Sequence, residues 1–168
     1  LKPNEDRLAF SAVFVLDKQA QVLKRTFTKS VIRSDKRFSY EEAQTVLDTQ
    51  QGPYLSELNT LLQLATVMRN ARADEGAIDF GDNEVRFELD ESGKPLRVIR
   101  KKRIDTNWLI EEFMLLANRE VASHIAKLAA KVPGSTMVFL YRIHDDPKPD
   151  RIEELATFVR AVGYDFGK

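Results

Sequence analysis

Two segments of the chain place residue types that could contact a ligand at ordered backbone positions. Gly76–Phe80 (GAIDF) is predicted to be a short strand that ends in an aromatic ring, and Leu109–Asn118 (LIEEFMLLAN) has helical periodicity. On that helix Glu111 and Asn118 lie about two turns apart, so they project from one face. The same face carries two apolar side chains, Leu115 and Ala122. Polar groups on such a stripe need partners, either inside the protein or in a ligand.

Two further charged clusters each allow a binding and a structural interpretation. Arg100–Arg103 (RKKR) could contact phosphates, or its charges could protect the exposed edge of a strand. His144–Asp146 resembles a metal or general-base cluster, but the following Pro147–Pro149 favours a loop. Because two histidines without spaced carboxylates are weak support for a metal site, we interpret His144–Asp146 as structural.

The composition excludes several classes of protein. The 168 residues are 43% hydrophobic and 31% charged, which is typical of a globular chain with one substantial core. There is no cysteine, so neither a disulfide framework nor a thiolate metal site is possible. Lys+Arg and Asp+Glu are 26 each, so any contact with nucleic acid would depend on a local patch or on other domains. No apolar run could span a membrane and no signal peptide is visible, so we expect a cytoplasmic protein without membrane contact.

The first half of the chain is expected to hold a hairpin and two helices. Leu8–Leu16 alternates apolar residues and, with Val22–Arg33, predicts a long antiparallel hairpin. Ser39–Glu42 is a capping box, in which the Ser39 hydroxyl accepts from the Glu42 amide, and it opens a helix to about Asp48. A second helix is expected over Leu55–Ala73.

The second half is expected to add strands and two more helices. Three short strands are expected, at Ala77–Phe80, Glu84–Leu89 and Leu96–Arg103. Thr136–Ile143 is nearly all apolar and predicts a strand covered on both faces. The helices are expected at Asp105–Ala130 and from a second capping box, Asp150–Glu153, to about Val162. The sum predicts an α+β fold over residues 1–168, a single domain with a mixed, largely antiparallel sheet and packed helices.

The order of these motifs resembles one known family. After the first hairpin come FSYEEAQTVLD, GAIDF, EVRFELDESG, NWLIEEFMLLANREVA and FLYRIHDDP. This order is similar to the middle of the catalytic (RNB) domain of ribonuclease II and ribonuclease R, which are processive 3′→5′ exoribonucleases. The resemblance covers the chain from Asn4 to Val162 and implies a partial RNB-domain fold.

The resemblance also implies how RNA would be bound. Single-stranded RNA would enter a channel, where aspartates hold Mg²⁺ and an attacking water, and the products would be nucleoside 5′-monophosphates. Phe80 matches the aromatic residue that stacks on the terminal base, while Tyr40 and Glu111 match residues that contact ribose and select RNA over DNA. Asn118 is a further candidate because it shares the face of Glu111. Stacking suits an enzyme that degrades any sequence, because every base has a π-face.

From the residues alone, Asn118 could either orient Glu111 or touch RNA, and the other three side chains also have a structural interpretation. Phe80 would be a core aromatic at the end of a strand. Tyr40, at the first position of a capped helix, would be a half-buried packing residue. Glu111 would be solvated or paired with an arginine.

The chain departs from the family pattern in two motifs. It lacks the spaced run of four aspartates, expected upstream, and the arginine of a Thr-Ser-Pro-Ile-Arg-like motif, expected downstream. We therefore expect a fragment of a longer parent protein, consistent with a first residue other than Met, that holds no Mg²⁺ and does not hydrolyse RNA alone. The parent would be monomeric, and a dimer of the fragment would be an artefact of exposed sheet edges. The alternative is a non-catalytic RNA-binding or protein-interaction module derived from the same domain.

Overall fold

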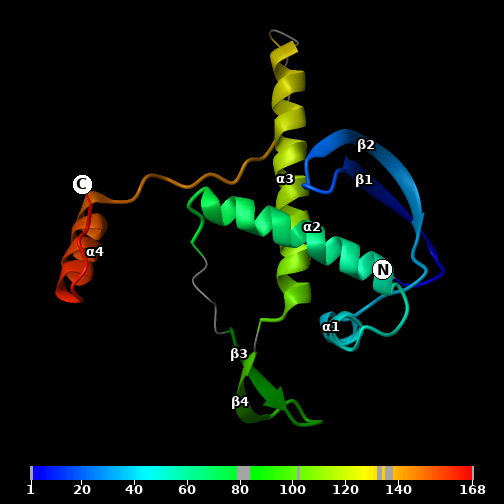
Figure 1. The fold of residues 1–168 in the computed structure, drawn as a ribbon, viewed down its shortest axis with the longest axis horizontal. Helices are drawn as coiled ribbons and strands as arrows, with labels where there is room; N and C mark the ends of the chain where they lie inside the picture. Colours follow the sequence, from blue (N-terminus) through cyan, green and yellow to red (C-terminus); the bar gives the residue numbers. More distant parts are fainter. Residues whose placement is uncertain (1, 79–83, 102, 132–133, 135–137, 168) are drawn as a thin grey trace.

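A computed structural model of the chain describes residues 2–78, 84–101, 103–131, 134 and 138–167. The elements in this part are β1 (Asp6–Leu16), β2 (Val22–Arg33), α1 (Tyr40–Thr49), α2 (Leu55–Asp74), β3 (Glu84–Leu89), β4 (Pro95–Lys101), α3 (Asp105–Lys131) and α4 (Pro149–Ala161). The strands form two separate antiparallel pairs, β1 with β2 and β3 with β4. Antiparallel hairpins thus alternate with pairs of helices along the chain, which confirms the predicted α+β class (Figure 1).

The first hairpin forms where the alternating pattern predicts it. Its antiparallel register runs from the pair Asp6 and Arg33 to the pair Val15 and Lys24. The Asp17 carboxylate closes the turn by accepting hydrogen bonds from the backbone amides of Gln19 at 2.9 Å and Gln21 at 2.8 Å. The turn chemistry is therefore local, and it sets which residues of the two strands pair.

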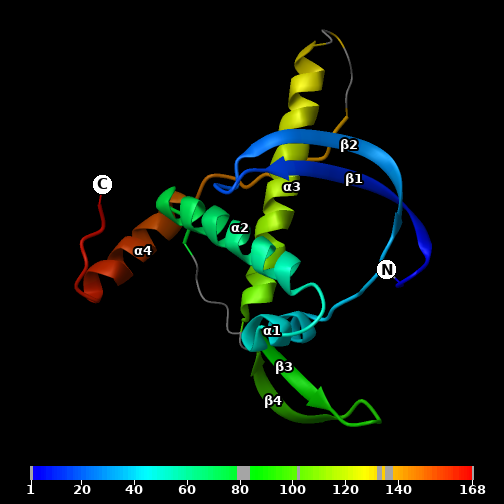
Figure 2. The same ribbon diagram turned by 45° about the vertical axis from the view of Figure 1, so that its right-hand side comes forward.

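The hairpin contacts α3 through an aromatic contact and an ion pair. The ring centroids of Phe27 and His124 are 4.6 Å apart. The Arg25 guanidinium lies 2.5 Å from the Glu120 carboxylate. Figure 2 shows β2 crossing α3 and curving away from the helix toward the start of α1.

Helices α1 and α2 have the predicted bounds to within a residue or two. The predicted capping box is confirmed: the Glu42 amide donates to the Ser39 hydroxyl at 3.1 Å, and the Ser39 amide donates to the Glu42 carboxylate at 2.7 Å. Gly52 follows α1 with a φ of 127°, and a Cβ there would lie 2.9 Å from the Val46 side chain. The turn between α1 and α2 therefore requires glycine at this position.

The long helix α3 is the support on which the other elements pack. Its 27 residues extend about 40 Å at 1.5 Å per residue. α2 crosses its N-terminal half, and α1 lies at its N-terminal end (Figures 1 and 2). The buried apolar side chains of these three helices are Ala43, Val46, Leu47, Ala65, Leu109 and Leu116. The described core therefore lies mainly where α1 and α2 meet α3.

The strand predicted at Thr136–Ile143 is wrong for the part that is described. Residues 138–148 have no regular structure, and Leu140 is 91% exposed. A β-rich apolar run forms a strand only where another strand offers it a hydrogen-bonding edge. None of the described strands pairs with this segment.

The second capping box is also wrong. α4 begins at Pro149, its N-cap is Lys148, and no side chain caps its first turn. Proline favours the first helical position because its fixed φ suits a helix and its missing N–H is not needed there. Asp150 therefore lies inside the helix instead of at its cap.

The region around the second hairpin agrees only in part with the prediction. β3, β4 and the turn between them are present, but β4 ends at Lys101 instead of Arg103. In the predicted strand Ala77–Phe80, Ala77 and Ile78 are not in a strand, and Asp79 and Phe80 lie outside the described residues. None of the helices in the described part of the chain has the length and apolar character needed to cross a bilayer.

Candidate functional site

Four charged side chains meet where α2 crosses α3. They are Arg72 of α2, Arg103 before α3, and Glu111 and Glu112 of α3, here named the α2–α3 charge cluster. Nη2 of Arg72 lies 2.5 Å from Oε1 of Glu112 and 3.6 Å from Oε1 of Glu111. Nη2 of Arg103 donates a hydrogen bond to Oε2 of Glu111. Each carboxylate thus has a cationic partner from outside its own helix.

Burial separates the two adjacent glutamates. The Glu112 side chain is 3% exposed, whereas the Glu111 side chain is 40% exposed. Glu112 follows Leu109 by three residues and precedes Leu116 by four, so it lies on the buried stripe of α3. A carboxylate in such a place needs a charged partner, and Arg72 provides it. The Glu111 side chain is therefore partly open to solvent, although both of its oxygens have an arginine partner.

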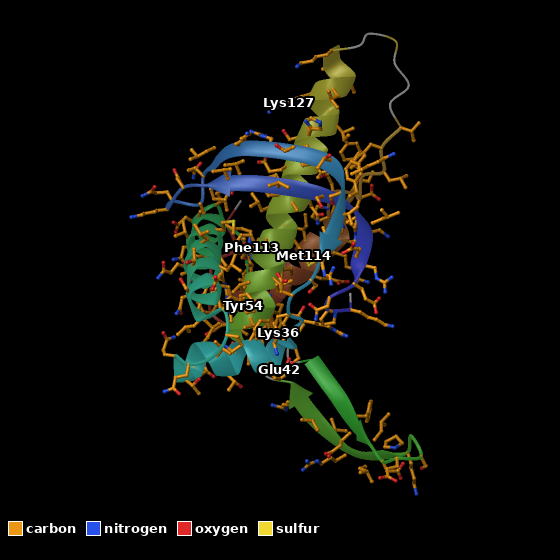
Figure 3. The ribbon with its side chains drawn as sticks, turned by 90° about the vertical axis from the view of Figure 1, so that its right-hand side faces the viewer. Lys36, Glu42, Tyr54, Phe113, Met114 and Lys127 are labelled. Atoms are coloured by element: carbon orange, nitrogen blue, oxygen red, sulfur yellow. The ribbon has the colours of Figure 1, made fainter. Side chains whose placement is uncertain are left out.

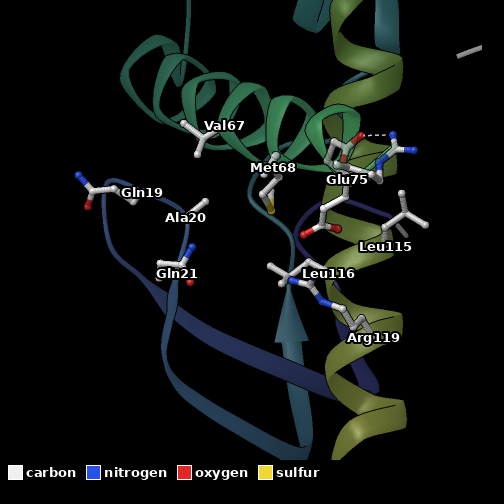
Figure 4. Close-up of a pocket in the computed structure, with 12 residues that line it drawn as sticks. Gln19, Ala20, Gln21, Val67, Met68, Glu75, Leu115, Leu116 and Arg119 are labelled. Atoms are coloured by element: carbon white, nitrogen blue, oxygen red, sulfur yellow. Dashed lines mark hydrogen bonds and ion pairs between the residues drawn. The ribbon is translucent and has the colours of Figure 1, made fainter. Parts of the chain in front are cut away.

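A cavity of about 420 Å³ lies beside the ion pair of Arg72, whose side chain is 40% exposed, and the buried Glu112. It is enclosed by the turn between β1 and β2, by α2 and by α3, and its walls include Met68, Leu116, Glu75 and Arg119 (Figure 4). The dashed line in Figure 4 marks the pair of Arg72 and Glu112 at its edge. Charges of both signs line this cavity, so its composition selects neither an anion nor a cation.

Tyr40 lies at a second cavity, of about 450 Å³, between α1, α2 and the start of α3. Its side chain is 43% exposed, and its carbonyl oxygen accepts a hydrogen bond from the Thr106 hydroxyl at 3.0 Å. The nearby Phe38 ring contacts the Tyr54 ring at 6.1 Å between centroids and the Lys36 ammonium at 5.1 Å. Figure 3 shows Lys36 and Tyr54 at the α1 end of the molecule. Tyr40 therefore sits at the edge of an apolar recess instead of inside the core.

The sequence-predicted site residues have different surroundings. Glu111 lies in the α2–α3 charge cluster, and Tyr40 lies at the second cavity. Asn118 is exposed on α3, and no hydrogen bond of its side chain occurs within the described residues. Phe80 lies outside the described residues. Contact of these four side chains with RNA stays a prediction.

Sequence reasoning missed Arg72 and Glu112. The position of Glu112 between Leu109 and Leu116 in helical spacing was a signal that could have found it. Arg72 had no comparable signal, because its partner lies 40 residues further along the chain. Of the basic residues in Arg100–Arg103, Arg103 donates a hydrogen bond to the Glu111 carboxylate.

The part of the chain that the structure describes offers no group of three or more histidine, aspartate or glutamate side chains that could hold a metal ion. His144–Asp146 lies exposed in the irregular segment 138–148.

Comparison with known proteins identifies the family. A family model of the RNB domain matches residues 1–166. DIS3-like exonuclease 2 of Schizosaccharomyces pombe is 35% identical over 182 residues, which cover 99% of this chain and 19% of that protein. Ribonuclease R of Thermotoga maritima is 33% identical over 169 residues, which cover 97% of this chain and 23% of that protein.

A solved structure also has a similar fold. The structure of Mycoplasma genitalium RNase R in complex with ribose methylated single-stranded RNA matches with a TM-score of 0.78 at 20% identity, over 95% of this chain and 24% of that chain. The chain spans about a fifth of the length of the curated relatives it matches, 19% and 23%. On the family match over residues 1–166, and in agreement with the order of its motifs, the chain belongs to the RNB-domain family.

Proposed function

We propose that the chain is part of a processive 3′→5′ exoribonuclease that hydrolyses single-stranded RNA to nucleoside 5′-monophosphates. The observation that carries this proposal is the RNB-domain match over residues 1–166. Its relatives include an exonuclease and a ribonuclease R. Structures of a ribonuclease R in complex with single-stranded RNA and with double-stranded RNA have a similar fold, which supports RNA as the ligand class.

Within this function, the chain supplies clamping of the 3′ end and recognition of ribose. Phe80 stacks on the terminal base, and Tyr40 and Glu111 contact ribose, with Asn118 as a further contact on the same face. The exposure of the two glutamates supports Glu111 for this role, because Glu112 is buried and paired with Arg72. A 2′-hydroxyl can donate to a carboxylate, whereas DNA has no hydroxyl there.

The parent protein uses Mg²⁺ in this proposal, but the described residues do not fit a metal site. No step through the metal is therefore assigned to this chain. We also propose a monomeric, cytoplasmic parent.

Replacement of Glu111 by Gln tests the ribose contact in the parent protein. The substrates are an RNA oligonucleotide and the same oligonucleotide with 2′-deoxy nucleotides at its 3′ end. We expect the ratio of kcat/KM for RNA over the deoxy substrate to fall about tenfold, because a hydrogen bond to a charged group contributes about 1.5–3 kcal/mol.

Glu154→Gln is the matched control for this experiment. It removes the same charge from an exposed pair with Arg151 on α4, so the substrate ratio should stay unchanged. An unchanged ratio in Glu111→Gln would remove the ribose role. If the parent binds single-stranded RNA but releases no nucleoside 5′-monophosphate with Mg²⁺, the non-catalytic module is the correct function.

A further inference from the structure

We propose that Arg72 is a positioning residue, which holds Glu111 in the orientation that reads ribose, and that the buried Glu112 fixes Arg72. The inference rests on the proposed contact between Glu111 and ribose. It assigns a task to two residues that are not among the proposed ribose contacts.

Arg72 is anchored to α3 by its ion pair with Glu112. Its Nη2 atom lies 2.5 Å from Oε1 of Glu112, whose side chain is 3% exposed. Side chains in a packed interior keep one rotamer, so Glu112 has a fixed position on α3. Arg72 comes from α2, and the pair therefore locks its guanidinium against α3.

The anchored Arg72 also contacts Glu111. The same Nη2 atom lies 3.6 Å from Oε1 of Glu111, while Arg103 donates to Oε2. Glu111 is thus held from two sides, by α2 and by the segment that leads into α3. A carboxylate has about four lone-pair positions, so these two contacts leave room for a hydroxyl donor.

The restraint on the Glu111 side chain affects how well it can bind ribose. A half-exposed glutamate without such contacts would sample several rotamers and would lose that freedom when it binds ribose. A carboxylate already held in place loses less, which increases its contribution to binding. Arg72 would therefore act on discrimination between RNA and DNA through Glu111.

A purely structural role for Arg72 makes a different prediction. In that case Arg72 only neutralises the buried Glu112, and removing both charges together would restore every property of the protein. Replacing a buried ion pair by apolar residues of similar volume is often neutral for stability or stabilising. The double variant Arg72→Met/Glu112→Met therefore separates folding from positioning.

The experiment measures thermal unfolding and, in the parent protein, the ratio of kcat/KM for RNA over the oligonucleotide with 2′-deoxy nucleotides at its 3′ end. Arg72→Met alone should lower the Tm, because it leaves the Glu112 carboxylate buried without its partner. It should also lower the kcat/KM ratio, because Glu111 loses its contact with Arg72. The double variant should regain the Tm but keep a ratio about tenfold below that of the unmodified protein, the effect of one charged hydrogen bond. Recovery of both properties in the double variant would overturn the proposal.

Arg25→Met is the matched control. It removes an arginine that lies 2.5 Å from Glu120, a glutamate of the same helix whose side chain is 12% exposed. Glu120 lies about two and a half turns beyond Glu111, so the substrate ratio should not change. An equal fall of the ratio in Arg25→Met would mean that any lost ion pair on α3 has this effect, and would contradict the assignment.

Glu111→Gln separates failure of this inference from failure of the proposed function. If Glu111→Gln leaves the ratio unchanged, the ribose contact is wrong, and positioning is wrong with it. If Glu111→Gln lowers the ratio but the double variant does not, only the role of Arg72 is wrong. In the Glu111→Gln background the double variant should add no further loss, because residues that act through one group are not additive.

Discussion

Glu111 and Glu112 are neighbours in the sequence and differ in almost every physical respect. One residue turns an α-helix by about 100°, which is enough to move a carboxylate from the buried stripe of α3 to its edge. Glu112 is enclosed and needs Arg72, whereas Glu111 is half exposed and shares its two oxygens between Arg72 and Arg103. The buried member depends on Arg72 to compensate its charge, and the exposed member is the one that a ligand can reach.

Replacement of Phe80 by Ala tests the proposed stacking of this ring on the terminal base. Loss of the ring in the parent protein is expected to weaken retention of the RNA 3′ end or to change the length of the limit product, because stacking is worth about 1–3 kcal/mol per base. Denaturing gels of a labelled oligonucleotide report both properties.

Phe80→Trp provides the control, since it keeps an aromatic face and should retain the original product length. If an active Phe80→Ala protein retained RNA as well as before and released the same limit product, the stacking assignment would be wrong.

At the scale of elements, the capping box of α1 combines a hydrogen bond with a charge. The Ser39 backbone amide, which donates to the carboxylate, together with the charges of Lys36 and Arg37, holds the pKa of Glu42 below its ordinary value of 4.5. A group whose pKa is lower in the folded state stabilises that state when it is ionised. This contribution is fully present above pH 4.5 and is lost as the pH falls through the lowered pKa.

Ser39→Ala is expected to reduce the free energy of local opening of α1 by about 1 kcal/mol, because the Glu42 amide loses its acceptor. Glu42→Gln should also favour opening at neutral pH, with a difference from the unmodified protein that disappears at acidic pH. Hydrogen exchange of the α1 amides across a pH series measures both effects.

The control is Ser56→Ala, near the start of α2, where the hydroxyl makes no hydrogen bond within the described residues. This change should alter local stability by no more than about 0.5 kcal/mol. A pH-independent effect of Glu42→Gln would contradict the role assigned to the ionised carboxylate.

The whole molecule exposes much apolar surface for its size. Leu8 is 90% exposed on β1, and residues of β3, β4 and the segment 138–148 are exposed as well. Figures 1 and 2 show the second hairpin and α4 extending away from the junction of α1, α2 and α3. Exposed strand edges and apolar side chains favour association between copies. A dimer of the isolated chain would therefore reflect this surface and would not establish a biological assembly.

The isolated chain is expected not to hydrolyse RNA, because its sequence lacks the run of four aspartates and the arginine motif that the family resemblance implies for catalysis. Incubation of the 168-residue chain with labelled single-stranded RNA and Mg²⁺ should release no nucleoside 5′-monophosphate, whereas the parent protein should release it. Product formation by the isolated chain that EDTA abolishes would show that its own residues complete a metal site.

Turns, caps and helix ends that depend on residues close together in the chain could be predicted from the amino-acid sequence. The Asp17 turn, the capping box at Ser39 and the ends of α2 each involve contacts over a few positions, so residue types and spacing were sufficient. The order of such motifs was also sufficient to indicate the family, which the match over residues 1–166 confirms.

Strand pairing and ion pairs between residues far apart in the chain became known only from the three-dimensional structure. Thr136–Ile143 has the composition of a strand, yet its described residues find no strand edge, because β-structure requires hydrogen bonds from another segment. The sequence suggested that an arginine could pair with Glu111 but could not say which one. That choice, and the sharing of Arg72 with the buried Glu112, follows from the packing of α2 across α3.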